Sequence, residues 1–302
     1  MAEPLGPLLE RLVARLGALD GEPQPLPGGI TNRNYRVTLG GSDYVVRVTS
    51  PETTLLEIDR AAEHEASLVA ARLGIGPEVA AFLAADASLV TRFIPGRRIA
   101  PEELRDPDTM TQVARAVRTV HDGPPIPATF NSFRVVQTYA RTAAAHGVPV
   151  PRDFTAASRV SAEIEAALQG EEHLRVPCHN DLLNANFIHD GTRVRIVDWE
   201  YAGMGDRYFD LGNLSINNGF EAADDRELLS AYFGEPCTPR RFAGLRLMRL
   251  MSDFREAMWG VVQSVVSPIV FDYTAYAARH FERLRTGAAD PRYRDWLRDT
   301  RG

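Results

Sequence analysis

The segment richest in potentially reactive side chains is HNDLLNAN at residues 179–186, and Asp198 follows twelve residues after Asn186. A loop carboxylate such as Asp181 can accept a hydroxyl proton, and the amide of Asn186 can ligate magnesium. A hairpin turn at Asp190-Gly191 would bring Asp198 back to the same ion. Each of these residues alone is an ordinary turn or strand-end residue. Together they predict magnesium-dependent phosphoryl transfer with Asp181 as the base.

The chain contains no lysine, and all 34 of its basic residues are arginine. This excludes Schiff-base and pyridoxal chemistry and the Walker A phosphate loop, because each of them needs a lysine. If the chain handles ATP, an arginine must contact the phosphates. The two cysteines, Cys178 and Cys237, have no metal-ligand spacing and indicate neither a zinc site nor a disulfide scaffold. Cys178 beside His179 is also a poor candidate nucleophile, since neighbours in an extended stretch point to opposite sides.

The elements that would position these residues fall into two groups along the chain. β-branched and aromatic stretches separated by glycine or proline indicate strands, and apolar residues at helical spacing indicate helices. The expected elements of the first group are helices over 8–19 and 57–73 and strands over 35–39, 44–48, 79–83 and 88–93. After Pro101 helical periodicity dominates, apart from the hairpin of residues 186–198. We therefore predict an α+β chain with two lobes, residues 1–95 and 96–302, that meet at a hinge near Pro95-Gly96.

Charge and hydropathy exclude several classes of protein. The net charge of -6 and the pI of about 5.7 argue against a nucleic-acid-binding surface and are compatible with a small cationic substrate. The first residues carry an acid where a secretory signal would be basic, and no apolar run approaches the length needed to cross a bilayer. The sequence therefore predicts a cytoplasmic protein without a membrane or nucleic-acid partner, and it leaves the oligomeric state open.

Four separated motifs resemble those of one family in the same order. CHNDLLNANF at 178–187 and VDWEYAGMGDRYFDLGNLS at 197–215 resemble the catalytic loop and metal-binding segment of choline/ethanolamine kinases. Residues 28–32 resemble the nucleotide loop of that family, and RFIPGRRI at 92–99 resembles its hinge. Choline/ethanolamine kinases belong with the aminoglycoside phosphotransferases and share the bilobal protein-kinase-like fold. The resemblance therefore implies that fold for this chain.

The resemblance also implies roles for individual residues. Asp181 would be the catalytic base, Asn186 and Asp198 would bind Mg²⁺, and His179 and Asp210 would steady the catalytic loop.

On the nucleotide side, Arg47 would replace the usual lysine at the ATP phosphates. Glu63 would orient Arg47, with Glu65 as the competing partner. The remaining residues expected at the nucleotide are Gly29, Thr31, Asn32, Asn34, Arg92, Phe93 and Ile94, and backbone groups between Thr91 and Ile94 would meet the adenine.

The acceptor site is predicted from Glu200 and Trp259. Asp210 follows Asp198 so closely that no long activation segment for docking a protein substrate fits between them. Glu200, two residues after the metal ligand, suggests a cationic acceptor. On a helical wheel Trp259 lies with Glu256, away from the apolar stripe of its helix, where its ring could face a quaternary ammonium group. Packing against another helix is the alternative for this tryptophan.

These observations predict an ATP- and Mg²⁺-dependent kinase for a small cationic amino alcohol, with choline as the first candidate. The resemblance is incomplete at the acceptor site, because Leu183, Met204 and Val262 stand where glutamine, tyrosine and a second tryptophan are usual. Ethanolamine, thiamine and an aminoglycoside therefore stay open as acceptors. A nucleotide-binding regulator without catalytic activity is the alternative outside enzymes, and the intact trio of Asp181, Asn186 and Asp198 argues against it.

Overall fold

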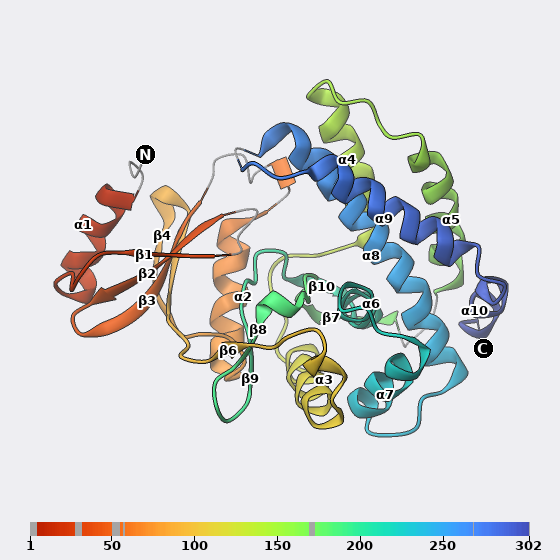
Figure 1. Cartoon of the computed structure of the whole chain (residues 1–302), viewed down its shortest axis with the longest axis horizontal. Coiled ribbons are helices and arrows are strands. Elements are labelled where there is room, and N and C mark those ends of the chain that lie inside the picture. The colour runs from red at the N-terminus through yellow and green to blue at the C-terminus, as the bar shows by residue number, and fades with distance from the viewer. Residues whose placement is uncertain are drawn as a thin grey trace.

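The computed structural model describes residues 5–27, 32–49, 55–56, 58–168, 173–267 and 269–301. Figure 1 shows a small sheet-rich lobe at one end of an elongated molecule and a larger, mainly helical lobe at the other. The predicted α+β architecture with two lobes is confirmed (Figure 1).

A five-stranded antiparallel sheet forms the small lobe. In spatial order its strands are β1 (Gln24–Leu26), β2 (Arg33–Leu39), β3 (Ser42–Val48), β5 (Ser88–Arg92) and β4 (Val79–Leu83). Gly40 and Gly41 both have positive φ and make the tight turn between β2 and β3. Helix α1 (Leu5–Leu16) buries its leucines in the core of this sheet. Strand β1 was not expected from the sequence, because its prolines read as a break after the first helix.

Helix α2 (Arg60–Arg72) lies between the sheet and the larger lobe, as Figure 1 shows. Asp59 caps its start and accepts hydrogen bonds from the backbone of Ala61 and Ala62 at 2.9 and 3.1 Å. The cap fixes the first turn, which carries Arg60 and Glu63. Ala66, Val69 and Ala70 of α2 belong to the larger hydrophobic core rather than to the core of the sheet.

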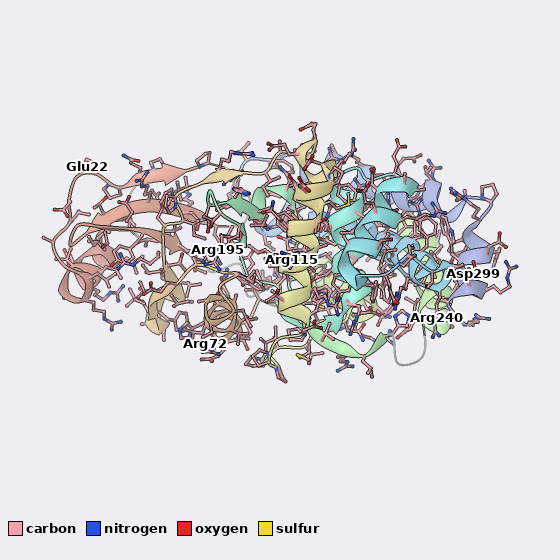
Figure 2. The ribbon with its side chains drawn as sticks, turned by 90° about the horizontal axis from the view of Figure 1, so that it is seen from below. Glu22, Arg72, Arg115, Arg195, Arg240 and Asp299 are labelled. Atoms are coloured by element: carbon pink, nitrogen blue, oxygen red, sulfur yellow. The ribbon has the colours of Figure 1, made fainter. Side chains whose placement is uncertain are left out.

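The two lobes are joined by residues 93–96 and by the hairpin predicted from Asp190-Gly191. Strand β6 (Arg97–Arg98) pairs with β8 (Phe187–His189), which pairs with β9 (Val194–Ile196). Gly96 approaches this hairpin so closely that an added Cβ would lie 2.5 Å from the carbonyl oxygen of His189. Arg195, labelled between the lobes in Figure 2, donates a hydrogen bond to the carbonyl oxygen of Ile75 at 3.2 Å. The hairpin that carries Asp198 is therefore held against the end of α2.

The larger lobe is built around the long helix α8. Its helices are α3 (Pro107–His121), α4 (Ser132–Ala145), α5 (Asp153–Ala167), α6 (Arg207–Asn217), α7 (Ala222–Phe233), α8 (Pro239–Val266), α9 (Tyr273–Ala288) and α10 (Tyr293–Asp299). A short antiparallel pair, β7 (Arg175–Cys178) with β10 (Gly203–Asp206), brackets the catalytic segment and was not predicted. Within the described residues, no helix is long and apolar enough to cross a membrane.

Helix α8 corrects one expectation from the helical wheel. Helices α4, α6, α9 and α10 all pack against it, and it is buried on nearly every side between Phe242 and Gln263. Trp259, expected away from the core side, is only 4% exposed. A wheel separates apolar from polar faces, but it does not show that a helix is central to its lobe.

Candidate active site

The predicted catalytic loop, residues 178–187, and the predicted metal-binding segment, residues 197–215, lie beside each other in the structure. The side-chain nitrogen of Asn186 donates a hydrogen bond to the carbonyl oxygen of Asp181 at 2.9 Å and lies 3.4 Å from its Oδ2. The backbone of Val197 donates to the carbonyl oxygen of Asn186 at 3.0 Å, which brings Asp198 next to this loop. Asp198 has a φ of 69°, a left-handed conformation that aspartate tolerates better than most residues and that is often found at functional sites.

The carboxylate of Asp210 accepts hydrogen bonds from the backbone of the catalytic loop. One of its carboxylate oxygens accepts from the backbone N–H of His179 at 2.8 Å, and the other accepts from that of Asn180 at 2.6 Å. His121, at the end of α3, places its Nε2 3.0 Å from Asp210 and its Nδ1 2.7 Å from the hydroxyl of Tyr232. The loop conformation that presents Asp181 thus depends on a buried chain of hydrogen bonds that includes His121 and Asp210, which was predicted to steady this loop.

Arg47 connects the small lobe to the metal-binding segment. Its guanidinium forms a buried ion pair with Glu63 and donates from Nη2 to Asp198 Oδ1 at 2.6 Å. Glu65, the competing partner, lies near His64 and its side chain is 53% exposed. The structure therefore places Glu63, and not Glu65, against Arg47.

A cavity of about 520 Å³ opens between the lobes next to Arg47 and Asp198. The lining includes Asn34, Glu63, Arg92, Phe93, Ile94 and Asn186 from the predicted nucleotide and metal residues, together with apolar side chains such as Val45, Leu89 and Ile188. Gly29 and Thr31, also predicted at the nucleotide, lie outside the described residues. The cavity combines an apolar slot with charged groups at one end, which is an arrangement that suits a nucleotide base and its phosphates.

Glu200 is turned toward the small lobe. Its Oε2 accepts from Asn32 at 2.7 Å and from Arg60 at 3.1 Å, and it lies 3.9 Å from Arg47. Arg60, which sequence reasoning missed, also reaches Glu63 at 2.6 Å. Arg60 stands one helical turn before Glu63, and this spacing is the signal that could have identified it.

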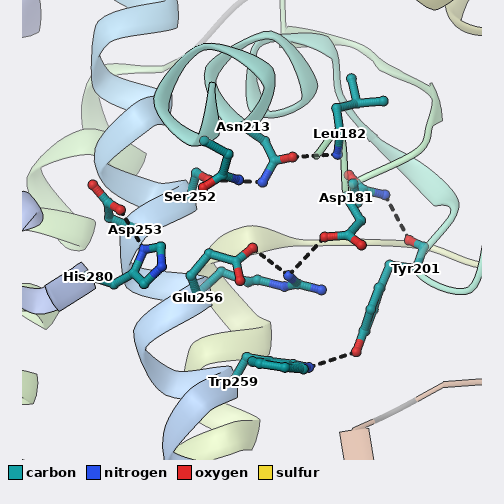
Figure 3. A network of polar contacts seen from close by, with 12 residues as sticks. Asp181, Leu182, Tyr201, Asn213, Ser252, Asp253, Glu256, Trp259 and His280 are labelled. Carbon is teal, nitrogen blue, oxygen red and sulfur yellow. Dashed lines mark hydrogen bonds and ion pairs between the residues drawn. The ribbon is translucent and has the colours of Figure 1, made fainter. Parts of the chain in front are cut away.

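Trp259 lies on the other side of the site, among aromatic side chains. Its indole N–H donates to the hydroxyl of Tyr201 at 2.9 Å, and its ring makes edge contacts with Tyr273 and Tyr276. Figure 3 shows Asp181, Tyr201, Glu256 and Trp259 around one region of the larger lobe. No hydrogen bond or ion pair joins Glu200 to Trp259 among the described residues, but Tyr201, the chain neighbour of Glu200, links the two.

Burial changes the ionisation of several of these groups. It raises the pKa of Asp181 well above its ordinary value, and Arg255 opposes this shift. Burial, followed by the nearby charge of Asp198, raises the pKa of Glu200 to about 7. Burial also raises the pKa of the Cys178 thiol well above its usual range, so Cys178 stays protonated and is inert as a nucleophile.

The sequence and the fold are similar to those of known proteins. Residues 22–249 match the model of the phosphotransferase enzyme family. A structure of a choline/ethanolamine kinase family protein from Mesorhizobium loti is 30% identical, with a TM-score of 0.82, and the match covers 97% of this chain and 99% of that one. Choline kinase LicA from Streptococcus pneumoniae shares the fold, with a TM-score of 0.80 at 21% identity over 94% of this chain and 99% of that one. Human ethanolamine kinase 2 is 27% identical over 65% of this chain, and the match spans 57% of the human protein.

A sheet-rich lobe, a helical lobe and, between them, a largely apolar cleft with charged groups at one end define a protein-kinase-like phosphotransferase. The length of the family match and the 30% identity to the Mesorhizobium loti protein identify the family itself. This chain belongs to the phosphotransferase enzyme family and, within it, to the choline/ethanolamine kinase family.

Proposed function

We propose that this protein transfers the γ-phosphate of ATP to the hydroxyl of a small cationic amino alcohol, with Mg²⁺ and with choline as the first candidate acceptor, in the cytoplasm. The observation that carries the proposal is the meeting of Asp181, Asn186, Asp198 and Arg47 beside the cavity between the lobes. A base, two oxygen ligands for a hard cation and a phosphate-binding cation are the parts that phosphoryl transfer requires.

The donor set fits magnesium. Asn186 uses its amide nitrogen for Asp181, so its amide oxygen remains as a ligand, and the carboxylate of Asp198 supplies a second oxygen. When bound, the ion would neutralise charge that develops on the phosphates. Arg47 would hold the phosphates from the small-lobe side, and Glu63 would keep its guanidinium in place.

Asp181 would act as the base for the acceptor hydroxyl. Its side chain is 13% exposed and lies between Asn186 on the metal side and Arg255 on the acceptor side. This position lets one carboxylate oxygen accept the hydroxyl proton while the loop, held by Asp210, keeps the group in place.

The acceptor's cationic group would meet Trp259 and Glu200. The aromatic rings around Trp259 offer the faces that attract a quaternary ammonium group. Glu200 would contribute negative charge from the side of the metal, next to Tyr201. Ethanolamine, thiamine and an aminoglycoside remain alternative acceptors for the same machinery.

The test is an ADP-release assay over choline, ethanolamine, thiamine, homoserine and aminoglycosides, with the mass of each product confirmed. We expect Mg²⁺-dependent turnover with a small cationic alcohol and a mass increase of one phosphate on that alcohol. Binding of ATP without turnover on any acceptor would instead support the regulator and refute the kinase.

A further inference from the structure

A buried arginine lies beside the proposed base, and the sequence did not single it out. Arg255 is 1% exposed, and its Nη1 lies 2.6 Å from Glu256 Oε1 and 3.5 Å from Asp181 Oδ1. Its guanidinium carbon stands 4.2 Å from the centre of the Tyr201 ring. The dashed lines from Asp181 and Glu256 in Figure 3 mark these two contacts. A protein cation thus occupies an aromatic face next to the catalytic carboxylate.

Some hydrogen-bond donors of the Arg255 side chain are unpaired in the described part of the chain. Within the described ranges, Nε and Nη2 of Arg255 are buried and have no hydrogen-bond partner. A buried charge with unused donors is costly, and apolar replacements of buried ion pairs are often neutral or stabilising. Packing alone therefore does not account for an arginine at this position, and its charge points to a role in the site.

When Asp181 is ionised, as the role of base requires, the charges around Arg255 leave one negative charge in excess. Asp181 and Glu256 contribute two carboxylates and Arg255 one cation, while the other partner of Glu256, the hydroxyl of Tyr276 at 2.6 Å, is neutral. Asp253, one turn earlier on α8, is already paired.

Asp253 accepts from the Nε of Arg283 at 2.9 Å, and the Nδ1 of His280 lies 2.8 Å from it. Its charge is therefore compensated within that group. The corner formed by Asp181, Glu256 and the aromatic rings can balance a single positive charge on a ligand.

We propose that Arg255 is a specificity residue that restricts the acceptor to one positive charge. This inference rests on the proposed kinase function. With Arg255 present, the cation of a singly charged amino alcohol balances the site. A second ammonium group on the acceptor would meet the guanidinium without a free carboxylate, and unpaired like charges in a buried site discriminate strongly between ligands. Amino alcohols with one amine would be substrates, whereas diamines and the polycationic aminoglycosides would be rejected.

The test uses two acceptors that differ by one ammonium group, N-propylethanolamine and N-(3-aminopropyl)ethanolamine. The measured quantity is the ratio of kcat/KM for the singly charged acceptor to that for the doubly charged one. Arg255→Met removes the charge but keeps much of the volume, and Arg255→Lys keeps the charge. Arg279→Gln is the matched control, because it removes an exposed guanidinium that lies 5.3 Å from the centre of the nearby Tyr276 ring.

We expect Arg255→Met to lower this ratio at least about tenfold, because the corner then holds two uncompensated carboxylates. Arg255→Lys and Arg279→Gln should leave the ratio within about threefold of the wild type. Glu256→Gln should move the ratio the opposite way, since it removes a negative charge, and this variant still decides the matter if Arg255→Met does not fold.

An equal loss of kcat/KM for both acceptors in Arg255→Met, at an unchanged ratio, would overturn the inference and assign Arg255 to packing. Homoserine as the best wild-type acceptor would also overturn it, because the unused N–H groups would then bind a carboxylate. If the wild type phosphorylates no cationic alcohol, the proposed function fails. If the wild type phosphorylates cationic alcohols but the ratio of the two kcat/KM values is unchanged in both Arg255→Met and Glu256→Gln, only the inference about charge fails.

Discussion

Replacing Asp181 with asparagine tests the centre of the proposed mechanism. The substitution keeps the shape of the side chain but removes its ability to take a proton. General-base assistance is worth roughly 10²–10⁴-fold, so kcat should fall by that factor, which corresponds to about 3 to 5 kcal/mol of barrier. The KM for ATP should barely change, because Asp181 is not among the residues that line the cavity between the lobes.

The fold should tolerate this change. Asparagine keeps the size and shape of Asp181, and Arg255 keeps Glu256 as its closer partner at 2.6 Å. We therefore expect the free energy of unfolding to stay within about 1 kcal/mol of the wild type.

The assay is steady-state ADP release with both substrates varied, accompanied by thermal unfolding. Asp190→Asn, the same chemical change in the hairpin turn, is the control and should keep the wild-type kcat. If Asp181→Asn retains a kcat within about threefold of the wild type, Asp181 is not the base.

Substitutions at four further positions test the other parts of the site. Arg47→Ala should raise the KM for ATP and slow transfer, and Arg47→Lys should recover part of the loss because lysine supplies a point charge. Unchanged kinetics in Arg47→Ala would mean that another arginine binds the phosphates. Asp198→Ala should abolish Mg²⁺-supported turnover in a magnesium titration, and a wild-type rate and magnesium dependence would contradict the proposed metal site. For a quaternary acceptor, Trp259→Ala should raise the acceptor KM by roughly 2- to 30-fold without changing that for ATP, since a cation–π contact is worth about 0.5–2 kcal/mol. Glu200→Gln should weaken cationic acceptors more than an uncharged alcohol of similar shape, and equal effects on ATP and acceptor in either variant would indicate damage to the fold instead.

Local sequence signals were enough to predict the hairpin that follows the predicted catalytic loop. The turn at Asp190-Gly191 specifies a hairpin through its own backbone preferences, and that hairpin brings Asp198 to the catalytic loop. The family resemblance favoured Glu63 over Glu65 because of its distance from Gly76-Pro77, and the ion pair of Glu63 with Arg47 agrees with that choice.

The acceptor side depends on contacts that no local pattern contains. Arg255 lies on α8, far along the chain from Asp181, and meets it only because α8 runs through the middle of the larger lobe. In a sequence, an arginine within a helix reads as a solvated charge. Its burial follows from helices packing on every side of α8, which is a property of the tertiary structure.

The ion pair between Arg47 and Asp198 has a consequence for how a nucleotide would enter the cleft. The guanidinium of Arg47 already donates hydrogen bonds to both Glu63 and Asp198. Under the proposed function, binding of Mg-ATP would exchange these contacts, because Arg47 would hold a phosphate in place of Asp198 and Asp198 would serve as a metal ligand. Added salt screens the pairs that break as well as those that form. The affinity for ATP should therefore vary less with ionic strength than the number of charged contacts in the complex would suggest.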